Sequence, residues 1–293
     1  MKNYKPIEEI MYPPAPHMVG NGFTVNNFFP GGYTQNIQRM SPFFLLDYNA
    51  KQTLAPSKIP RGVGVHPHRG LETVTLAVHG KIAHHDSKGN SGIIGPGDVQ
   101  WMTAGAGVLH KEYQEAHFNR LGGDFQMVQL WVNLPAKHKM TPAKYQAIEN
   151  NTMGKYYIDN KQSVVEIIAG EYNGIRGPAD TFTPIQLYVA RLKKGAKASF
   201  IFPEIYPTGC LILEGDLQIN KEIDAPVNRF ILFENKGTDV DIEAKEDSIC
   251  LLMSGEAINE PIVPYGPFLM NTKEEIRQAY QDYEKGKFGE LED

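Results

Sequence analysis

Hydrophobic and polar residues alternate along this chain in short segments that turn signals separate. Two segments rich in β-branched and aromatic residues are ETVTLAV (72–78) and FQMVQLWVNL (125–134). Glycine-containing turns lie at 31–32, 62–64, 88–90, 95–97 and 105–107. Short strands at this spacing, with few helical patterns between them, are typical of an all-β sandwich or barrel.

The pattern pauses in a polar stretch at 135–163 and then resumes. Strand-like segments follow at 164–170, 184–192, 209–220, 229–234 and 248–255. Residues 76–82 and 211–217 share one shape, in which an apolar strand turns at a glycine into another strand. The second half therefore reads as a copy of the first, and we predict two β domains, at 1–135 and 140–255.

A helix is predicted in the tail, residues 256–293. Thr272 and Glu275 form a capping box, in which each side chain satisfies a free backbone N–H of the first turn. An apolar stripe follows at Ile276, Ala279, Tyr280 and Tyr283. Gly286 can end the helix in a left-handed conformation. The proline-rich segment 259–268 before it must run extended, as a strap that carries the helix to a docking site on a barrel.

Charge and composition exclude several classes of protein. The net charge is −5 over 293 residues and no stretch concentrates Lys and Arg, so direct nucleic-acid binding is not expected. No apolar run approaches the ~20 residues of a membrane span, and the N-terminus lacks the pattern of a signal peptide. Cys210 and Cys250 lie in apolar runs and read as buried free thiols, which fits a cytoplasmic protein.

The histidines are unevenly distributed. All nine lie in the first 138 residues, at positions 17, 66, 68, 79, 84, 85, 110, 117 and 138. If the two halves are repeats, only the first can carry an imidazole site. The second half would then be a structural partner.

Two pairs of residues, each containing histidine, have the spacing of metal ligands. His66 and His68 are two residues apart on a predicted strand, so their side chains share one face. After the glycine turn at 105–107, His110 and Glu112 offer a second pair with the same property. Three imidazoles and a carboxylate suit iron, with Zn, Cu, Ni or Mn also possible.

Other residues of this region keep alternative interpretations. Glu72 is either a further ligand or an acceptor that fixes an imidazole tautomer, and spacing alone does not decide between them. His84-His85-Asp86 is interpreted as a hydrogen-bonded hairpin end. Trp101 and Met102 are candidates for a pocket wall, and a core-packing role is at least as good an interpretation of both.

These motifs closely resemble those of the pirin family of the cupin superfamily. The matching segments are HPHRGLETVTL (66–76), DSKGNSGIIGPGDVQWMTAGAGVLHKE (86–112), QLWVNLPAKHKMTPAKYQ (129–146) and GEAINEPIVPYGPFLMNTKEEI (255–276). The resemblance implies a bicupin of two antiparallel β-barrels, with iron in the N-terminal barrel. Fe²⁺ is the expected form of the metal. The resemblance also implies that the second barrel is degenerate, and that the C-terminal helix packs across the barrels.

Carried over by position, the family's metal ligands fall on His66, His68, His110 and Glu112, which leaves Glu72 outside the coordination sphere. The chain departs from the family pattern at three positions. Leu71 stands where an aromatic residue is usual, His79 where Glu is common, and Ala106 where Arg is frequent. The last change lies in the turn before His110 and could alter access of a substrate.

The resemblance implies two classes of function. Some pirins cleave flavonols such as quercetin with O₂; Glu112 would then be the general base for the substrate hydroxyl that binds the metal. Others act without catalysis, as metal- or redox-dependent regulators that bind protein partners. The protein is expected in the cytoplasm, and in the nucleus as well if its source is eukaryotic. A third possibility is a metal-stabilised barrel with an unknown small-molecule substrate. A cavity of ~300–1,000 Å³ beside the metal would favour the enzyme.

Overall fold

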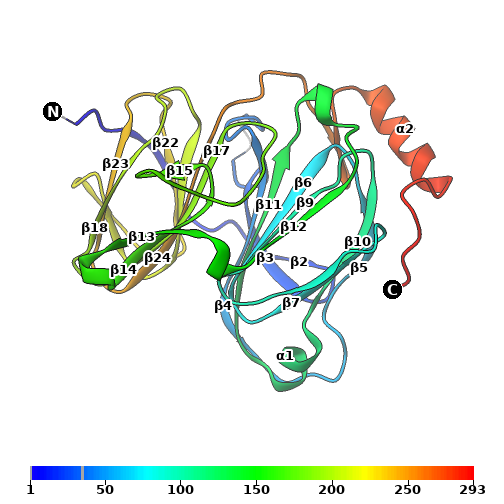
Figure 1. Cartoon of the computed structure of the whole chain (residues 1–293), viewed down its shortest axis with the longest axis horizontal. Helices are drawn as coiled ribbons and strands as arrows, with labels where there is room; N and C mark the ends of the chain where they lie inside the picture. Colours follow the sequence, from blue (N-terminus) through cyan, green and yellow to red (C-terminus); the bar gives the residue numbers. More distant parts are fainter. Residues whose placement is uncertain (1, 34–35) are drawn as a thin grey trace. The chain divides into compact units, whose positions relative to one another are not determined.

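The computed structural model describes residues 2–33 and 36–293 and consists mostly of β-strands (Figure 1). The chain forms two compact units, and each contains a seven-stranded and a four-stranded antiparallel sheet. The predicted all-β, two-barrel architecture is therefore confirmed. The alternation of short apolar segments with glycine turns was the pattern that indicated it.

The first barrel comprises residues 15–30, 43–149 and 258–293 and contains all nine histidines. Its seven-stranded sheet has the spatial order β12 (Lys144–Ile148), β9 (Val99–Thr103), β6 (Leu71–His79), β11 (Gly123–Asn133), β4 (Phe43–Leu54), β3 (Phe23–Phe29) and β2 (His17–Val19). Its four-stranded sheet has the order β5 (Gly62–His68), β10 (Val108–Gln114), β7 (Ile82–Asp86) and β8 (Ser91–Ile94). The remaining elements are α1 (Ala116–Leu121), a 3₁₀ turn at Ala136–His138, β25 (Val263–Tyr265), β26 (Phe268–Met270) and α2 (Lys273–Glu284).

The second barrel comprises Met1–Pro14, Gly31–Pro42 and Asn150–Ala257. Its seven-stranded sheet has the order β1 (Ile7–Met11), β22 (Phe230–Phe233), β19 (Thr208–Glu214), β24 (Ser248–Gly255), β17 (Ile185–Leu192), β14 (Ser163–Ala169) and β13 (Gly154–Ile158). Its four-stranded sheet has the order β18 (Lys197–Ile201), β23 (Asp239–Ala244), β20 (Leu217–Ile219) and β21 (Ile223–Ala225). The other elements are the hairpin β15 (Glu171–Tyr172) and β16 (Ile175–Arg176), and 3₁₀ turns at Asn150–Thr152 and Asp159–Lys161.

Aromatic side chains occupy the interior of the second barrel. The rings of Tyr172, Tyr188, Phe200 and Phe202 lie 5.1–6.2 Å from their neighbours in this set, centroid to centroid, among other buried apolar residues. Both cysteines belong to the same buried core and are free thiols, as the sequence indicated. Aromatic and aliphatic side chains thus fill the interior of this barrel.

The boundaries of the units differ from the predicted 1–135 and 140–255. Strand β1 pairs with β22, so the N-terminal segment belongs to the second barrel. Strand β12, placed after the predicted boundary, pairs with β9 and belongs to the first barrel. Both pairings join segments far apart in sequence, and nothing in the local pattern of either strand specifies its partner.

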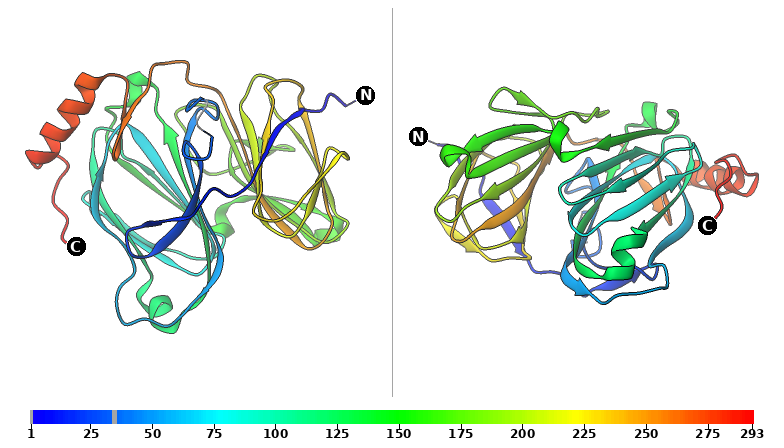
Figure 2. Two further views of the ribbon diagram at one scale, coloured as in Figure 1. Left: turned by 180° about the vertical axis from the view of Figure 1, so that it is seen from behind. Right: turned by 60° about the horizontal axis from the view of Figure 1, so that its bottom comes forward.

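The C-terminal helix α2 docks on the first barrel, where it lies outside the strands in both views of Figure 2 (red). Its predicted capping box is present: Thr272 Oγ1 accepts from the Glu275 N–H (3.2 Å), and the Glu275 carboxylate accepts from the Thr272 N–H (2.8 Å). Ile276 and Ala279 are buried against strand β26, whereas Tyr283 of the predicted stripe is 41% exposed. The apolar contact therefore covers only the first two turns.

A buried ion pair fixes the second half of α2. Arg69 Nη1 lies 2.9 Å from Asp282 Oδ2, and both side chains are less than a tenth exposed. Arg69 Nε also donates to the carbonyl of Ala106 (2.7 Å), and its guanidinium lies over the ring of Phe288 (4.7 Å). Because Arg69 directly follows His68, these contacts join the C-terminal helix to one end of strand β5.

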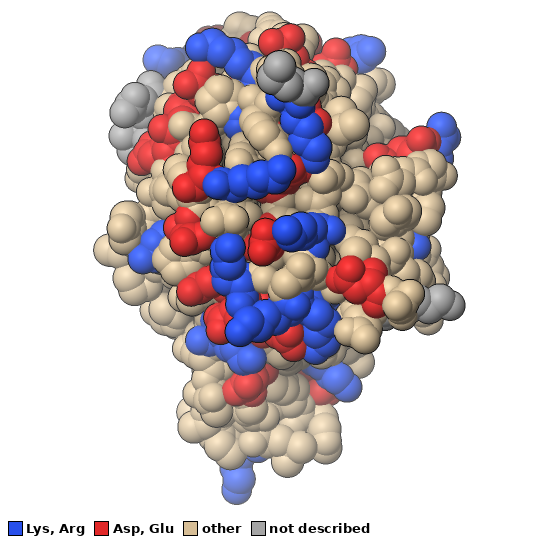
Figure 3. Space-filling view, turned by 90° about the vertical axis from the view of Figure 1, so that its left-hand side faces the viewer, with Lys and Arg blue, Asp and Glu red and all other residues tan. Residues whose placement is uncertain are grey.

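Charges of both signs alternate on the face of the molecule in Figure 3, without an extended patch of one sign. Surface ion pairs of the second barrel likewise place opposite charges side by side, for example Lys193–Asp247 and Lys197–Glu243. Within the described residues, no helix has the length and apolar composition needed to cross a membrane.

Candidate metal centre

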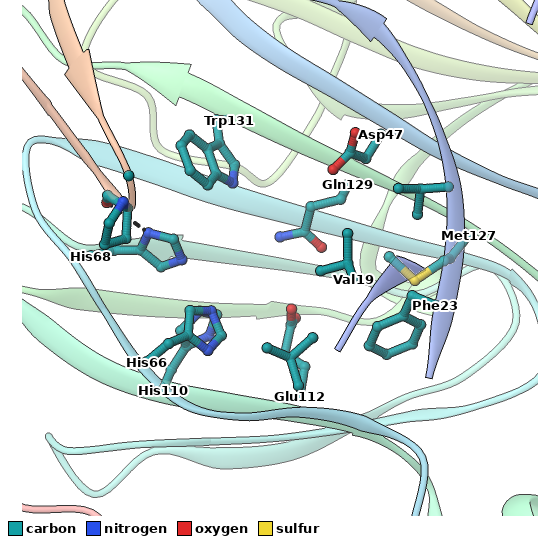
Figure 4. A pocket seen from close by; sticks show the side chains of 14 residues that line it. Val19, Phe23, Asp47, His66, His68, His110, Glu112, Met127, Gln129 and Trp131 are labelled. Carbon is teal, nitrogen blue, oxygen red and sulfur yellow. Dashed lines mark hydrogen bonds between the residues drawn. The ribbon is translucent and has the colours of Figure 1, made fainter. Parts of the chain in front are cut away.

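Three histidine side chains converge inside the first barrel (Figure 4). His66 and His68 lie on strand β5, and His110 is the antiparallel partner of His66 on strand β10. Their ring centroids are 4.2–5.0 Å apart, and one ligand atom from each lies within 4.8 Å of the other two. The two-residue spacing of the motif thus places both β5 histidines on the same inner face, as predicted.

Backbone carbonyls fix the orientation of two of these rings. His66 Nδ1 lies 2.8 Å from the carbonyl oxygen of Gly64, and His68 Nδ1 lies 3.0 Å from that of Pro267. A carbonyl oxygen only accepts, so each Nδ1 must carry the hydrogen. The lone pair of each neutral ring is then on Nε2, the atom that remains for a metal ion.

The third imidazole is fully buried and has no hydrogen-bond partner at either nitrogen within the described residues. Burial, together with the neighbouring His66 and His68, holds the pKa of His110 well below its usual range. Burial and His66 lower the pKa of His68 to about 3. These imidazoles are therefore neutral at physiological pH, which is the form that binds a metal ion.

Glu112 provides a carboxylate in the same pocket. Its Oε1 accepts hydrogen bonds from Thr75 Oγ1 (2.9 Å) and Gln100 Nε2 (3.2 Å), both on the opposite sheet. Within the described part of the chain, Oε2 has no hydrogen-bond partner. A carboxylate oxygen of Glu112 lies within 4.8 Å of a nitrogen of His110 and of His84. His66 and His68 do not belong to this second set.

The donor set fits a divalent transition-metal ion. Buried imidazole nitrogens without partners are costly unless they meet a ligand, at about 1–3 kcal/mol each. Here, two rings present Nε2 to one point, His110 leaves both nitrogens unpaired, and a carboxylate stands beside them. Nitrogen donors with one carboxylate are typical ligands of Fe, Zn, Cu and Ni.

The pocket beside the histidines has a volume of about 240 Å³ and opens to solvent. Its walls are mainly apolar, and they include Val19, Phe23, Val63, Met127 and Trp131. Polar atoms enter it from Asp47 and Gln129, which are paired neighbours on β4 and β11. The volume lies just below the ~300–1,000 Å³ usual for small-molecule sites, so a larger ligand would extend into the opening.

Comparison with known proteins decides the family. The model of the Pirin family matches residues 22–132, and that of the Pirin C-terminal cupin domain matches residues 187–289. The chain belongs to the pirin family. The resemblance inferred from the sequence motifs is thus confirmed, and it extends over both barrels.

Relatives of this pirin share most of its length. A Pseudomonas aeruginosa protein named "Putative quercetin 2,3-dioxygenase PA2418" is 42% identical over 272 residues, which cover 93% of this chain and 94% of the relative. A tomato (Solanum lycopersicum) pirin-like protein is 37% identical over 86% of this chain and 84% of its own. The crystal structure of quercetin 2,3-dioxygenase from Acinetobacter baumannii superimposes with a TM-score of 0.91 at 44% identity, covering 98% and 99% of the two chains.

Glu72 lies outside the histidine cluster. Gly70, with a φ of +78°, separates strand β5 from β6, and these strands belong to different sheets. Side chains alternate along β6, so Glu72 points away from the face on which Thr75 meets Glu112. Its Oε1 instead accepts from Thr103 Oγ1 (2.7 Å). The interpretations of Glu72 as a ligand or as a partner of an imidazole therefore find no support in these contacts.

We expect Glu72 to make stability fall with rising pH. Burial raises the pKa of Glu72 from 4.5 to about 7. Between these values the unfolded chain has released a proton that the folded protein keeps, so stability is lost as pH rises, by at most roughly 3 kcal/mol. Urea unfolding of wild type and Glu72→Gln at pH 5 and pH 8 measures this. A wild-type loss no larger than that of the variant would contradict the assignment.

Sequence reasoning missed several residues of the pocket. Trp101 and Met102, the suggested wall residues, are fully buried and pack in the core. Trp131 lines the pocket instead, with its ring 5.1 Å from that of His68. It lies in one of the strand segments noted in the sequence, but the face it occupies depends on how β11 pairs with its neighbours.

Proposed function

We propose that this pirin binds one metal ion through Nε2 of His66, His68 and His110 and through Glu112, and that Fe²⁺ is the preferred metal. We further propose that the protein cleaves flavonols with O₂. One observation carries the proposal: the ligand atoms of three imidazoles lie within 4.8 Å of one another at the wall of an apolar pocket, and Glu112 lies beside His110 in the same pocket. The printed names of the Pseudomonas and Acinetobacter relatives support the same substrate class.

Ligand number favours a reactive centre over a structural one. Structural zinc sites are usually closed, with four protein ligands in a tetrahedron. Iron commonly accepts six ligands, so the four proposed here would leave room for substrate. When bound, the metal would supply Lewis-acid stabilisation of a phenolic oxygen that has lost its proton.

Glu112 is proposed as the group that takes this proton. Thr75 and Gln100 both hold its Oε1, so Oε2 would be a weak metal ligand and would take the proton when a substrate hydroxyl displaces it. A base positioned within hydrogen-bond reach contributes typically 10²–10⁴-fold to a rate. The two donors would therefore keep the carboxylate oriented while its other oxygen works.

The apolar wall is proposed to hold the aromatic rings of the substrate. Phe23, Met127 and Trp131 present ring and thioether surfaces to the pocket. Aromatic pairs gain about 0.5–1.5 kcal/mol beyond the burial of their area. Asp47 lies between these walls with one oxygen bound by Asn27 Nδ2 (2.7 Å), and it offers an acceptor to a hydroxyl group on the substrate.

Oxygen-dependent bleaching of a flavonol tests the proposal. Wild-type protein loaded with Fe²⁺ is expected to remove the flavonol absorption band under air and not under nitrogen, with matching O₂ consumption across a panel of phenolics. Protein stripped by a chelator is the control and should be inactive. If no tested metal supports oxygen-dependent bleaching, the enzyme proposal fails and the non-catalytic regulator becomes the better hypothesis.

A further inference from the structure

His110 differs from the other two imidazoles in what surrounds it. His66 and His68 each have Nδ1 fixed by a backbone carbonyl, whereas no carbonyl of the described residues hydrogen-bonds to His110. The side chain that faces it from the other side is His84, with ring centroids 5.4 Å apart. One nitrogen of His84 lies within 4.8 Å of a ligand atom of both His110 and Glu112.

His84 is itself buried and unsatisfied. It lies on β7 directly opposite Glu112 of β10, is fully shielded from solvent, and has no hydrogen-bond partner at either nitrogen within the described residues. The ring of Tyr145 stacks on it at 5.0 Å with an angle of 19° between the planes. The sequence interpretation as a hairpin end was therefore wrong for His84, whose side chain lies inside the barrel.

That interpretation was right for the neighbouring Asp86. Its Oδ1 accepts from the backbone N–H groups of Lys88 (2.8 Å) and Asn90 (3.0 Å), which closes the turn after β7. Its Oδ2 points to His84, at 3.6 Å from Nε2. Burial raises the pKa of Asp86, but the nearby His84 and the hydrogen bonds from Asn90 and Lys88 outweigh it and leave the pKa below its usual value, so the group is a carboxylate.

We propose that His84 is a positioning residue that orients His110 for the metal. The Asp86 carboxylate favours the His84 tautomer with hydrogen on Nε2, so Nδ1 of His84 becomes an acceptor for the N–H of His110. The nitrogen spacing of up to 4.8 Å is one that a single water molecule can bridge. A chain from carboxylate through imidazole to ligand does for His110 what Gly64 and Pro267 do for the other two rings.

This inference rests on the proposed metal site but assigns a residue outside its ligand set. The alternative is that His84 is itself a ligand, together with His110 and Glu112, since these three also lie at ligand distance. Stacking on Tyr145 and proximity to Asp86 restrain the His84 ring, as expected for a supporting group. The two roles differ in the number of nitrogens that a bound metal would contact.

Measuring metal affinity tests whether His84 contributes to metal binding at all. In His84→Leu, the affinity for Zn²⁺, measured by competition with a chelator, is expected to fall about 10–100-fold. His84→Gln keeps a polar end at similar length and should recover most of the loss. His85→Leu is the matched control, because His85 is the next residue and is exposed. Thermal unfolding of the metal-free proteins checks that each variant folds, and His84→Ala replaces His84→Leu if the latter does not.

Electron paramagnetic resonance of the Cu²⁺-loaded proteins separates positioning from ligation. The number of coordinated nitrogens should be the same in His84→Leu as in wild type. A lost nitrogen would make His84 a ligand and overturn the proposal, as would wild-type affinity in His84→Leu. A wild type that binds no metal would instead refute the proposed function, so the two failures are distinguishable.

Discussion

Replacing Glu112 with Gln is expected to leave most of the bound metal in place and to lower flavonol turnover about 10²–10⁴-fold. Gln has nearly the same size, and its carbonyl oxygen can still accept from Thr75 and Gln100. The other end of the amide then carries hydrogens and cannot take a proton from substrate. Metal content by elemental analysis and turnover under air, measured on the same preparation, give the two quantities.

Glu72→Gln provides the matched control for this experiment. Glu72 is buried like Glu112, but it lies on the seven-stranded sheet and its carboxylate accepts from Thr103 rather than lining the pocket. We expect this variant to retain turnover close to wild type at a pH where both proteins are folded. Full turnover in Glu112→Gln with full metal content would exclude Glu112 as the base.

A double replacement, His66→Ala with His68→Ala, is expected to remove nearly all bound metal. It deletes two of the three imidazoles whose nitrogens converge, and the remaining His110 and Glu112 make a poor site. The control is His85→Ala with His117→Ala, which removes two exposed histidines of the same barrel. Elemental analysis after loading and gel filtration should show metal only in the control. Full occupancy of the His66→Ala/His68→Ala protein would refute the ligand assignment.

The two pairs of proposed ligands could be predicted because each pair lies within one strand. Residues two apart on a strand share a face whatever the strand pairs with, and this holds for His66 and His68 on β5 and for His110 and Glu112 on β10. Spacing could not decide the role of Glu72, because the turn at Gly70 moves the chain to the other sheet. Spacing tells which side chains share a face only within one strand, and not across a turn into another sheet.

Contacts between distant segments were not predictable from the pattern. The carbonyl that orients His68 belongs to Pro267 in the C-terminal strap, and the donors to Glu112 come from two strands of the opposite sheet. The helix of the tail was predictable, since its capping box is encoded within four residues. Its buried ion pair with Arg69 was not, because Arg69 and Asp282 meet only in the folded barrel.

The origin of the oxygen atoms in the product distinguishes a dioxygenase from the alternatives. Fe²⁺-loaded wild-type protein is mixed with a flavonol under ¹⁸O₂, and the ring-opened product is analysed by mass spectrometry. A 2,3-dioxygenase must place both atoms of one O₂ molecule in its products, and the His66→Ala/His68→Ala protein should form none. Incorporation of label at both oxygens, absent in that variant, is the predicted result. Product that carries oxygen from water alone, or that forms equally without the two histidines, would refute the proposed dioxygenase activity.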